Sequence, residues 1–285
     1  MDLTQCSALE WGQSGSLPLI RLKTTEFEAE ILTQGAQLMH FAPTGQEPWI
    51  FRSPNTPYTP GREIFGGIPV IFPWFGRLKG HPEAPNHAFA RQANWQIDEV
   101  APNGTQLTLS LSDAQVREQG IDTSLWPHPF QARTQFWFGE TLRVRFEVDN
   151  TGPEAVEFTC ALHTYYTADP SSTSVEGLDG ETMESVDGKI RRTQNGDIHF
   201  EGLVTKAFPV AGGPITIRDA QRSFVLTPNE GWRSTIVWNP GEAMEDLTDK
   251  DVRSFVCVEA GAIYSSAISL EAGATYALDF SVALS

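Results

Sequence analysis

Short stretches of alternating apolar and polar residues, separated by turn-forming residues, recur throughout this 285-residue chain. Residues 107–111 follow a turn at residues 102–104, and residues 130–149 form two such stretches on either side of Gly139 and Glu140. A period of two places apolar side chains on one face of a strand, and closely spaced turns join strands into sheets. No segment keeps the 3.6-residue period of a helix over several turns. The sequence therefore predicts an all-β protein, either a sandwich or a barrel.

The same pattern locates the remaining elements. One or two helical turns are expected at residues 113–119 and again at 242–249, and long loops at residues 51–61 and 169–195. The sequence contains no internal repeat or linker, so we expect one domain over residues 1–285. Further strands are expected at residues 215–217, 223–226, 234–238, 267–270 and 276–282.

Composition limits the possible partners. Hydrophobic residues make up 40% of the chain, and 36 acidic against 20 basic residues give a formal net charge of −16. This charge disfavours nucleic acids and anionic membranes as partners, and a phosphorylated ligand would need a local basic pocket. No apolar run has the length of a membrane span. Cys6, Cys160 and Cys257 have no metal-ligand spacing, and we expect free thiols in a reduced, cytoplasmic protein that is a monomer.

The most informative single residue is Glu259. It lies in the apolar run 254–263, which reads as a strand buried on both faces. Burial raises the pKa of a carboxyl group and thereby produces a base that works near neutral pH. His163 lies in a second apolar run, residues 155–166, on the more polar face of that strand. The two residues predict an acid/base site; the alternative for Glu259 is a buried salt bridge to an arginine.

Residues 65–76 form an intensely apolar segment with too many glycines and prolines for a regular strand. We expect a buried irregular ribbon. The segment between residues 62 and 91 has a local excess of two positive charges, which favours a polar or anionic ligand, unless the ribbon is structural and its flanking charges are merely solvated. The flanking cations are Arg62, Arg77, Lys79 and Arg91.

His87 and Arg91 are four residues apart and could hydrogen-bond a polar ligand, although His87 could equally be structural. Trp74 and Trp238 are candidate stacking surfaces for a sugar ring, with a core position as the alternative. We expect no metal, because His87, His163, His199 and Glu259 lack tight ligand spacing. The sequence has neither a Gly-x-Ser-x-Gly motif nor a glycine-rich phosphate loop.

Five segments, in this order, resemble the aldose 1-epimerase superfamily, and most closely its hexose-6-phosphate mutarotase branch, also called glucose-6-phosphate 1-epimerase. The resemblance implies a galactose-mutarotase-like β-supersandwich of large antiparallel sheets. It also implies His163 as general acid, Glu259 as general base, and His87 and Arg91 as substrate-site residues. The segments are residues 66–76 (GGIPVIFPWFG), 87–91 (HAFAR), 161–166 (ALHTYY), 237–240 (VWNP) and 256–260 (VCVEA).

The chain differs from the branch at three positions. Phe65 stands where the branch usually has Arg, Ala88 where it has Gly, and Thr205 where it has a sugar-binding Asp. The first and third differences bear on whether the substrate is phosphorylated and whether the chain is catalytic. A non-catalytic carbohydrate-binding or regulatory protein therefore remains an alternative. A sugar lyase or hydrolase is a third class, but hydrolysis normally uses paired carboxylates, and the sequence shows no second interior acid to match Glu259.

The function implied by the resemblance is interconversion of the α and β anomers of a hexose or hexose 6-phosphate, without a cofactor. A base removes the proton of the C1 hydroxyl while an acid protonates the ring oxygen O5. The ring opens, C1 rotates, and the ring closes on its other face. We expect Glu259 and His163 to stand on opposite sides of the C1–O5 unit, across a single cleft.

Overall fold

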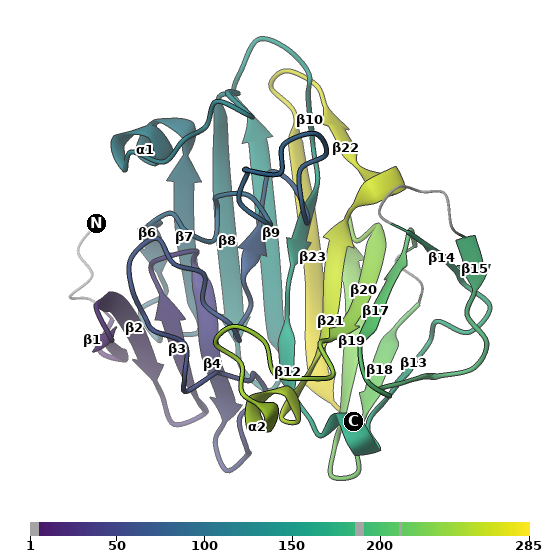
Figure 1. Cartoon of the computed structure of the whole chain (residues 1–285). Coiled ribbons are helices and arrows are strands. Elements are labelled where there is room, and N and C mark those ends of the chain that lie inside the picture. Colours follow the sequence, from purple (N-terminus) through teal and green to yellow (C-terminus); the bar gives the residue numbers. More distant parts are fainter. Residues whose placement is uncertain (1–5, 186–190, 211–212) are drawn as a thin grey trace.

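The computed structural model describes residues 6–185, 191–210 and 213–285, and these residues form sheets with few helices. All strand pairs of the three large sheets are antiparallel, so the all-β sandwich expected from the sequence is confirmed (Figure 1). The largest sheet has nine strands in the order β16 (Ile198–His199), β13 (Ser174–Glu176), β18 (Ile215–Arg218), β19 (Ser223–Glu230), β23 (Thr275–Leu284), β9 (Leu142–Asn150), β8 (Phe130–Phe138), β7 (Gln106–Ser112) and β6 (Gln96–Val100).

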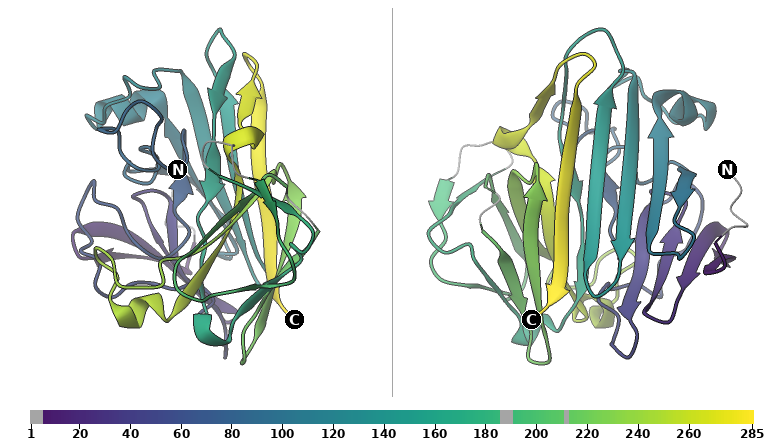
Figure 2. Two further views of the ribbon diagram at one scale, coloured as in Figure 1. Left: turned by 45° about the vertical axis from the view of Figure 1, so that its right-hand side comes forward. Right: turned by 180° about the vertical axis from the view of Figure 1, so that it is seen from behind.

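Two smaller sheets lie against one face of the nine-stranded sheet, as the view from behind makes clear (Figure 2). The four-stranded sheet contains β1 (Leu9–Ser14), β2 (Leu17–Lys23), β3 (Phe27–Leu32) and β4 (Gln37–Pro43). The six-stranded sheet contains β17 (Val204–Phe208), β20 (Ser234–Asn239), β21 (Phe255–Ala262), β11 (Cys160–Leu162) and β5 (Val70–Ile71), and β12 (Tyr165–Thr167) also pairs with β21. Two further pairs join β10 (Val156–Phe158) to β22 (Ile268–Leu270) and β14 (Thr182–Glu184) to β15 (Arg191–Thr193).

The main hydrophobic core fills the space between these layers. In β8 and β9 every second residue is buried, as the alternating sequence predicts. Aromatic rings join the layers: Phe27 of β3 stacks on Phe138 of β8 with ring centroids 5.3 Å apart, and Phe72 lies 5.7 Å from Phe146 of β9. The inner face of β21 packs against this core.

The helices are short. α1 (Asp113–Glu118) lies where the sequence predicts it and begins with a capping box at Ser112. The prediction for residues 242–249 is wrong, because α2 (Asp249–Val252) begins only where that segment ends, after the Thr248 N-cap. No helix among the described residues is long and apolar enough to span a membrane.

Residues 169–195 are not the single long loop that we expect from their polar composition. They contain β13, β14, β15 and the 3₁₀ turn η2 (Pro170–Ser172), although residues 186–190 lie outside the described part. Each of these elements has only three residues, too few for a periodic pattern to register in the sequence. Residues 51–61 do form a loop, apart from an isolated bridge at Arg52.

The apolar segment 65–76 is a mostly buried irregular ribbon, as expected, with only β5 as regular structure. Its paired glycines are required by close packing. Gly66 and Gly67 have φ angles of +98° and +72°. A Cβ atom would lie 2.7 Å from the Phe51 carbonyl oxygen at Gly66 and 2.5 Å from the Leu38 carbonyl oxygen at Gly67. The glycines thus let the ribbon lie directly against two other backbone segments.

Candidate active site

The register of three strands places His163 beside Glu259. Leu162 of β11 pairs with Ala260 of β21, and Tyr165 of β12 pairs with Cys257. The two pairs share one antiparallel register, and continuing it places residue 163 opposite residue 259. Side chains directly opposite one another in such a pair lie close together on the same face. His163 Nε2 accordingly lies 3.4 Å from Glu259 Oε1.

The face of β21 that carries Glu259 points away from the main core. Val256, Val258 and Ala260 pack into that core, whereas Phe255 and Cys257 belong to a smaller apolar cluster next to Glu259. Both faces of this strand are buried, as the apolar run 254–263 predicts. The result is a carboxyl group whose side chain is 1% exposed, at the floor of a cavity.

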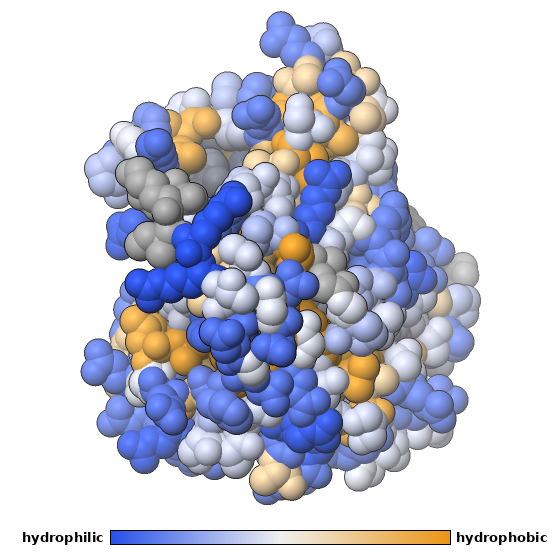
Figure 3. Space-filling model, turned by 90° about the vertical axis from the view of Figure 1, so that its right-hand side faces the viewer, coloured by the Kyte–Doolittle hydropathy of each residue, from blue (hydrophilic) through white to orange (hydrophobic). Residues whose placement is uncertain are grey.

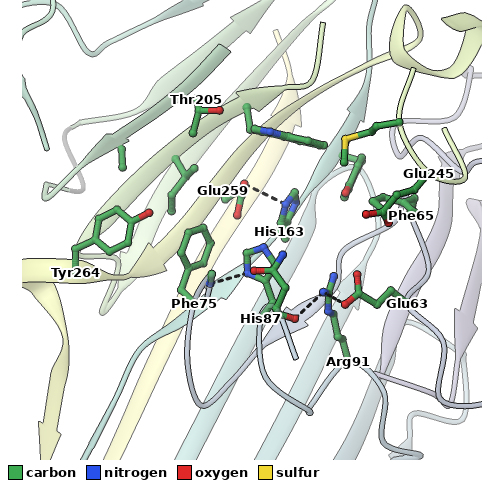
Figure 4. Close-up of a pocket in the computed structure, with 17 residues that line it drawn as sticks. Glu63, Phe65, Phe75, His87, Arg91, His163, Thr205, Glu245, Glu259 and Tyr264 are labelled. Carbon is green, nitrogen blue, oxygen red and sulfur yellow. Dashed lines mark hydrogen bonds and ion pairs between the residues drawn. The ribbon is translucent and has the colours of Figure 1, made fainter. Parts of the chain in front are cut away.

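The cavity has a volume of about 300 Å³ and lies on the outer side of the six-stranded sheet (Figure 4). This size is at the lower end of the range of small-molecule sites. Aromatic side chains form much of its wall. It is lined by Glu63, Phe65, Phe75, Gly76, Asn86, His87, Arg91, His163, Tyr165, Thr205, Ala207, Ile236, Trp238, Met244, Glu245, Glu259 and Tyr264.

Burial determines the protonation of the central pair. It raises the pKa of Glu259 well above its usual value, because the ionised carboxylate is removed from water. Burial, together with the nearby Arg91 guanidinium, lowers the pKa of His163 to about 3. Both shifts favour neutral groups. His163 is therefore a neutral imidazole at physiological pH, and burial favours the proton of the pair on Glu259.

His87 is held as a hydrogen-bond donor. Its Nδ1 accepts a hydrogen bond from the Gly76 backbone amide at 3.0 Å. Burial and the neighbouring Arg91 charge lower the pKa of His87 well below 6.5, so the ring is neutral. A neutral imidazole that accepts at Nδ1 carries its proton on Nε2. The ring centroid lies 5.8 Å from that of His163. His87 can thus donate to an oxygen atom bound beside His163.

Arg91 is a buried cation with a carboxylate partner. Its Nη2 contacts Glu63 Oε1 and also donates to the Asn86 carbonyl oxygen at 2.8 Å. Figure 4 shows this pair next to His87 and below the central His163–Glu259 contact. Its positive charge is therefore largely balanced within the protein.

Three buried polar atoms of the site have no hydrogen-bond partner among the described residues: Glu259 Oε2, His163 Nδ1 and Arg91 Nε. Buried polar atoms are nearly always paired, and unpaired ones concentrate where a ligand or water binds. Their presence in one cavity indicates a site that is completed by a polar ligand.

Left-handed backbone also concentrates here. Of the non-glycine residues with positive φ among the described residues, His87 (+61°), Glu245 (+44°) and Tyr264 (+49°) line the cavity, and Ala88 (+55°) adjoins it. Such conformations cost free energy and persist where the surrounding structure imposes them, often at functional sites. The φ of Ala88 is also one that glycine adopts freely, which accounts for a glycine preference at this position.

Not every candidate residue reaches the cavity. His87, Arg91, His163, Trp238 and Glu259 line it. Four candidates do not. Arg62 pairs with Asp246 at 2.9 Å, Arg77 and Lys79 are exposed beyond the ribbon, and Trp74 is buried with its Nε1 donating to the Pro85 carbonyl oxygen.

The cavity also contains residues that the sequence did not point to, chiefly Glu63, Met244, Glu245 and Tyr264. Glu63 lies in the segment of residues 62–91, where basic residues are in excess. The other three lie in loops or a 3₁₀ turn without a periodic pattern. Among the described residues no group of three or more His, Cys, Asp or Glu side chains is arranged to hold a metal ion.

Known proteins similar to this chain identify its family. A family model described as aldose 1-epimerase matches residues 18–283. A protein of Cenchrus ciliaris named "putative glucose-6-phosphate 1-epimerase" is 34% identical over 252 residues, covering 82% of this chain and 75% of the relative. A protein of Escherichia coli K12 with the same name is 31% identical, covering 85% and 82%.

Solved structures show the same fold. The crystal structure of a "putative mutarotase" from Salmonella typhimurium superposes with a TM-score of 0.84 and 26% identity, covering 98% of this chain and 94% of that one. The galactose-mutarotase-like sandwich inferred from five short motifs is thereby confirmed.

Proposed function

This chain belongs to the aldose 1-epimerase family, and we propose that it interconverts the α and β anomers of a hexose or hexose 6-phosphate by acid/base ring opening. One observation carries the proposal: His163 Nε2 and Glu259 Oε1 lie 3.4 Å apart at the floor of a cavity that leaves Glu259 Oε2 unpaired. Two relatives named "putative glucose-6-phosphate 1-epimerase" support a hexose or hexose 6-phosphate as the class of substrate.

The adjacent positions correct one expectation. From the sequence we expect the acid and the base on opposite sides of the C1–O5 unit. The 3.4 Å between His163 Nε2 and Glu259 Oε1 leaves no room for a sugar between the two groups. Adjacent groups suit the reaction because O1 and O5 are bonded to the same carbon. A base next to an acid can therefore address both oxygens from one side of the sugar.

The proposed mechanism uses one proton held by the pair. Hydrogen bonds from sugar hydroxyls stabilise the Glu259 carboxylate, and the proton passes to His163 Nε2. Glu259 then removes the proton from the C1 hydroxyl while His163 protonates O5, and the C1–O5 bond breaks to give the open aldehyde. C1 turns about its bond to C2. Closure reverses both transfers and restores the pair.

Other side chains of the cavity contribute to binding of the sugar. The Nε2–H of neutral His87 and the free Nε–H of Arg91 are donors for sugar oxygens. Trp238, whose ring lies 5.7 Å from that of His163, and Phe75 offer apolar faces to the carbon side of a pyranose.

The proposal is tested by the rate at which freshly dissolved α-glucose, α-galactose and glucose 6-phosphate reach anomeric equilibrium, followed by polarimetry or NMR exchange. Glu259→Gln and His163→Asn should each lower the catalysed rate by about 10²–10⁴-fold, the usual contribution of a general acid or base. Glu140→Gln, in the exposed turn between β8 and β9, serves as the control and should keep the wild-type rate.

Two results would contradict the proposal. Wild-type acceleration in both site variants would remove the catalytic roles of His163 and Glu259. A folded wild-type protein that binds sugars without accelerating any exchange would instead support the non-catalytic carbohydrate-binding alternative.

A further inference from the structure

The charges around the cavity are unequal. Among the described residues that line it, the carboxyl groups of Glu63, Glu245 and Glu259 face a single permanent cation, Arg91. Arg91 is already paired with Glu63. His87 and His163 add no positive charge to the empty site, because burial keeps both imidazoles neutral. The cavity therefore offers no uncompensated cation from its described lining.

The other cations that the sequence suggested for the site are either paired or lie outside the cavity. The guanidinium of Arg62 binds both carboxylate oxygens of Asp246, at 3.0 and 2.9 Å. This pair neutralises Arg62. It also anchors Asp246, the residue that follows Glu245 in the chain. Arg77 and Lys79 are exposed and do not line the cavity.

Phe65 occupies the wall where a basic residue would serve an anionic group. It lines the cavity, is 9% exposed, and belongs to the apolar cluster that contains Phe255 and Cys257. A phosphate group placed against this ring would lose water without gaining a hydrogen bond, which is costly for an anion.

Sugar hydroxyls, by contrast, fit the polar groups that are present. A hydroxyl both donates and accepts, so it can donate to the carboxylates of Glu63 and Glu245 and accept from the amide of Asn86. The hydroxyls of Thr205 and Tyr264 add two groups of the same kind. A phosphate monoester carries about −1.5 to −2 charges at neutral pH and accepts rather than donates, so carboxylates repel it.

We propose that the substrate of this chain is an uncharged hexose with a free 6-hydroxyl, and that Glu245, the lining carboxylate that Arg91 does not compensate, excludes hexose 6-phosphates. This inference rests on the proposed function and narrows its substrate class. It separates the chain from the relatives that are named after the 6-phosphate.

The test compares kcat/KM for anomer exchange of glucose and galactose with that for their 6-phosphates, at equal ionic strength. Like-charge contacts in a specific site cost several kcal/mol, so we expect the uncharged sugars to be preferred by at least about tenfold. Adding salt should raise kcat/KM for the phosphates and leave that for the free sugars unchanged, because salt screens only the charged encounter.

Charge variants locate the effect. Glu245→Lys should reduce the preference for the uncharged sugar by at least about threefold, and Glu245→Gln should reduce it less. Glu140→Lys is the matched control: it changes the net charge by the same amount in an exposed turn outside the cavity, and its preference should equal that of the wild type.

The outcomes are distinguishable. Catalysis with equal or higher kcat/KM for a 6-phosphate would overturn this inference and leave the epimerase proposal intact. Failure of the folded protein to accelerate exchange of any sugar would overturn the epimerase proposal, and the substrate inference with it. An equal change of preference in Glu245→Lys and Glu140→Lys would show that net charge, and not Glu245, selects the substrate.

Discussion

The two central residues are unusual because burial shifts the pKa of each toward its uncharged form. Glu259 has a raised pKa and His163 has a pKa lowered to about 3, and burial is the main cause of both shifts. An exposed histidine would be protonated below about pH 6.5 and an exposed glutamate ionised above about 4.3. The site shifts both pKa values against this order, so that the proton of the pair is favoured on Glu259 rather than on His163.

The pH dependence of kcat/KM follows from these shifts. As the pH falls through about 3, His163 also becomes protonated, so that the pair holds two protons and no base remains. As the pH rises through the raised pKa of Glu259, the pair loses its only proton, and no acid remains. We therefore expect kcat/KM to show no acidic limb near pH 6.5, the usual pKa of a histidine, and to fall as the pH rises through the raised pKa of Glu259. An acidic limb near pH 6.5 would contradict this assignment.

At the residue scale the sequence was informative where chemistry and strand pattern coincide. A carboxylate and an imidazole inside apolar strands identified Glu259 and His163 as members of one site before their register was known. The 3.4 Å contact could not be predicted, because it depends on how β11 and β12 align with β21. Tyr264 reaches the cavity from the first position of the 3₁₀ turn η3 (Tyr264–Ser266), where its own φ is positive, and this turn has no signature in the sequence.

At the scale of elements, the cavity depends on contacts that hold its loops. The clearest is between β14 and η3. The Glu184 carboxyl group at the end of β14 has a side-chain exposure of only 1%. It accepts hydrogen bonds from the Ser265 amide at 3.1 Å and from the Ser265 hydroxyl at 2.8 Å. Ser265 follows Tyr264, so this buried carboxylate positions one wall of the cavity.

Glu184→Gln should weaken this anchor while keeping its shape. Hydrogen bonds to a carboxylate are stronger than those to an amide, and we expect KM for the sugar to rise by up to about tenfold with a smaller change in kcat. The pH profile should not move, because His163 and Glu259 are untouched. Glu181→Gln, at the residue just before β14, is the control. Equal KM values in the two variants would show that Glu184 does not position Tyr264.

Element prediction succeeded where strands are long and alternate regularly, as in β7, β8, β9 and β23. It failed for three-residue strands such as β13 and β14, whose pairing is imposed by neighbouring segments rather than by a local pattern. The ribbon at residues 65–76 was identified by composition alone. Its contact with β11, which brings it to the cavity, depends on tertiary packing.

At the scale of the whole molecule, a formal net charge of −16 goes with a largely polar visible surface. The face shown in Figure 3 is mostly hydrophilic, with hydrophobic residues in small separate groups. Among the described residues the large exposed apolar side chains are Trp11 and Leu203. The alternation predicts a sandwich or a barrel, and the family resemblance implies the sandwich. The order of nine strands in one sheet depends on long-range pairings that a single sequence does not display.

The outer face of the nine-stranded sheet carries an ionic network centred on Asp279 of β23. Arg143 of β9 donates to Asp279 at 2.6 Å, Arg145 at 3.3 Å and Asn229 at 3.0 Å, while the neighbouring Leu278 and Phe280 point into the core. Burial by itself would raise the pKa of Asp279, but these hydrogen bonds and the arginine charges hold it below its usual value. The network therefore joins three strands far from the cavity.

Asp279→Ala should lower the free energy of unfolding at neutral pH by about 2–4 kcal/mol, because it leaves two arginines without their shared partner. The folded-state pKa of Asp279 is depressed, so its contribution is present above the pKa of the unfolded chain and is lost as the pH falls through the folded-state pKa. Urea unfolding at pH 7 and pH 3 should then show a smaller difference between variant and wild type at pH 3.

Glu271→Ala, which removes an exposed carboxylate after β22, is the control and should leave the free energy of unfolding unchanged at both pH values. The KM of the folded Asp279→Ala protein should equal that of the wild type, since the network lies on the sheet that does not carry the catalytic pair. A stability loss that is as large at pH 3 as at pH 7 would show that packing around Asp279, and not its charge, holds these strands together.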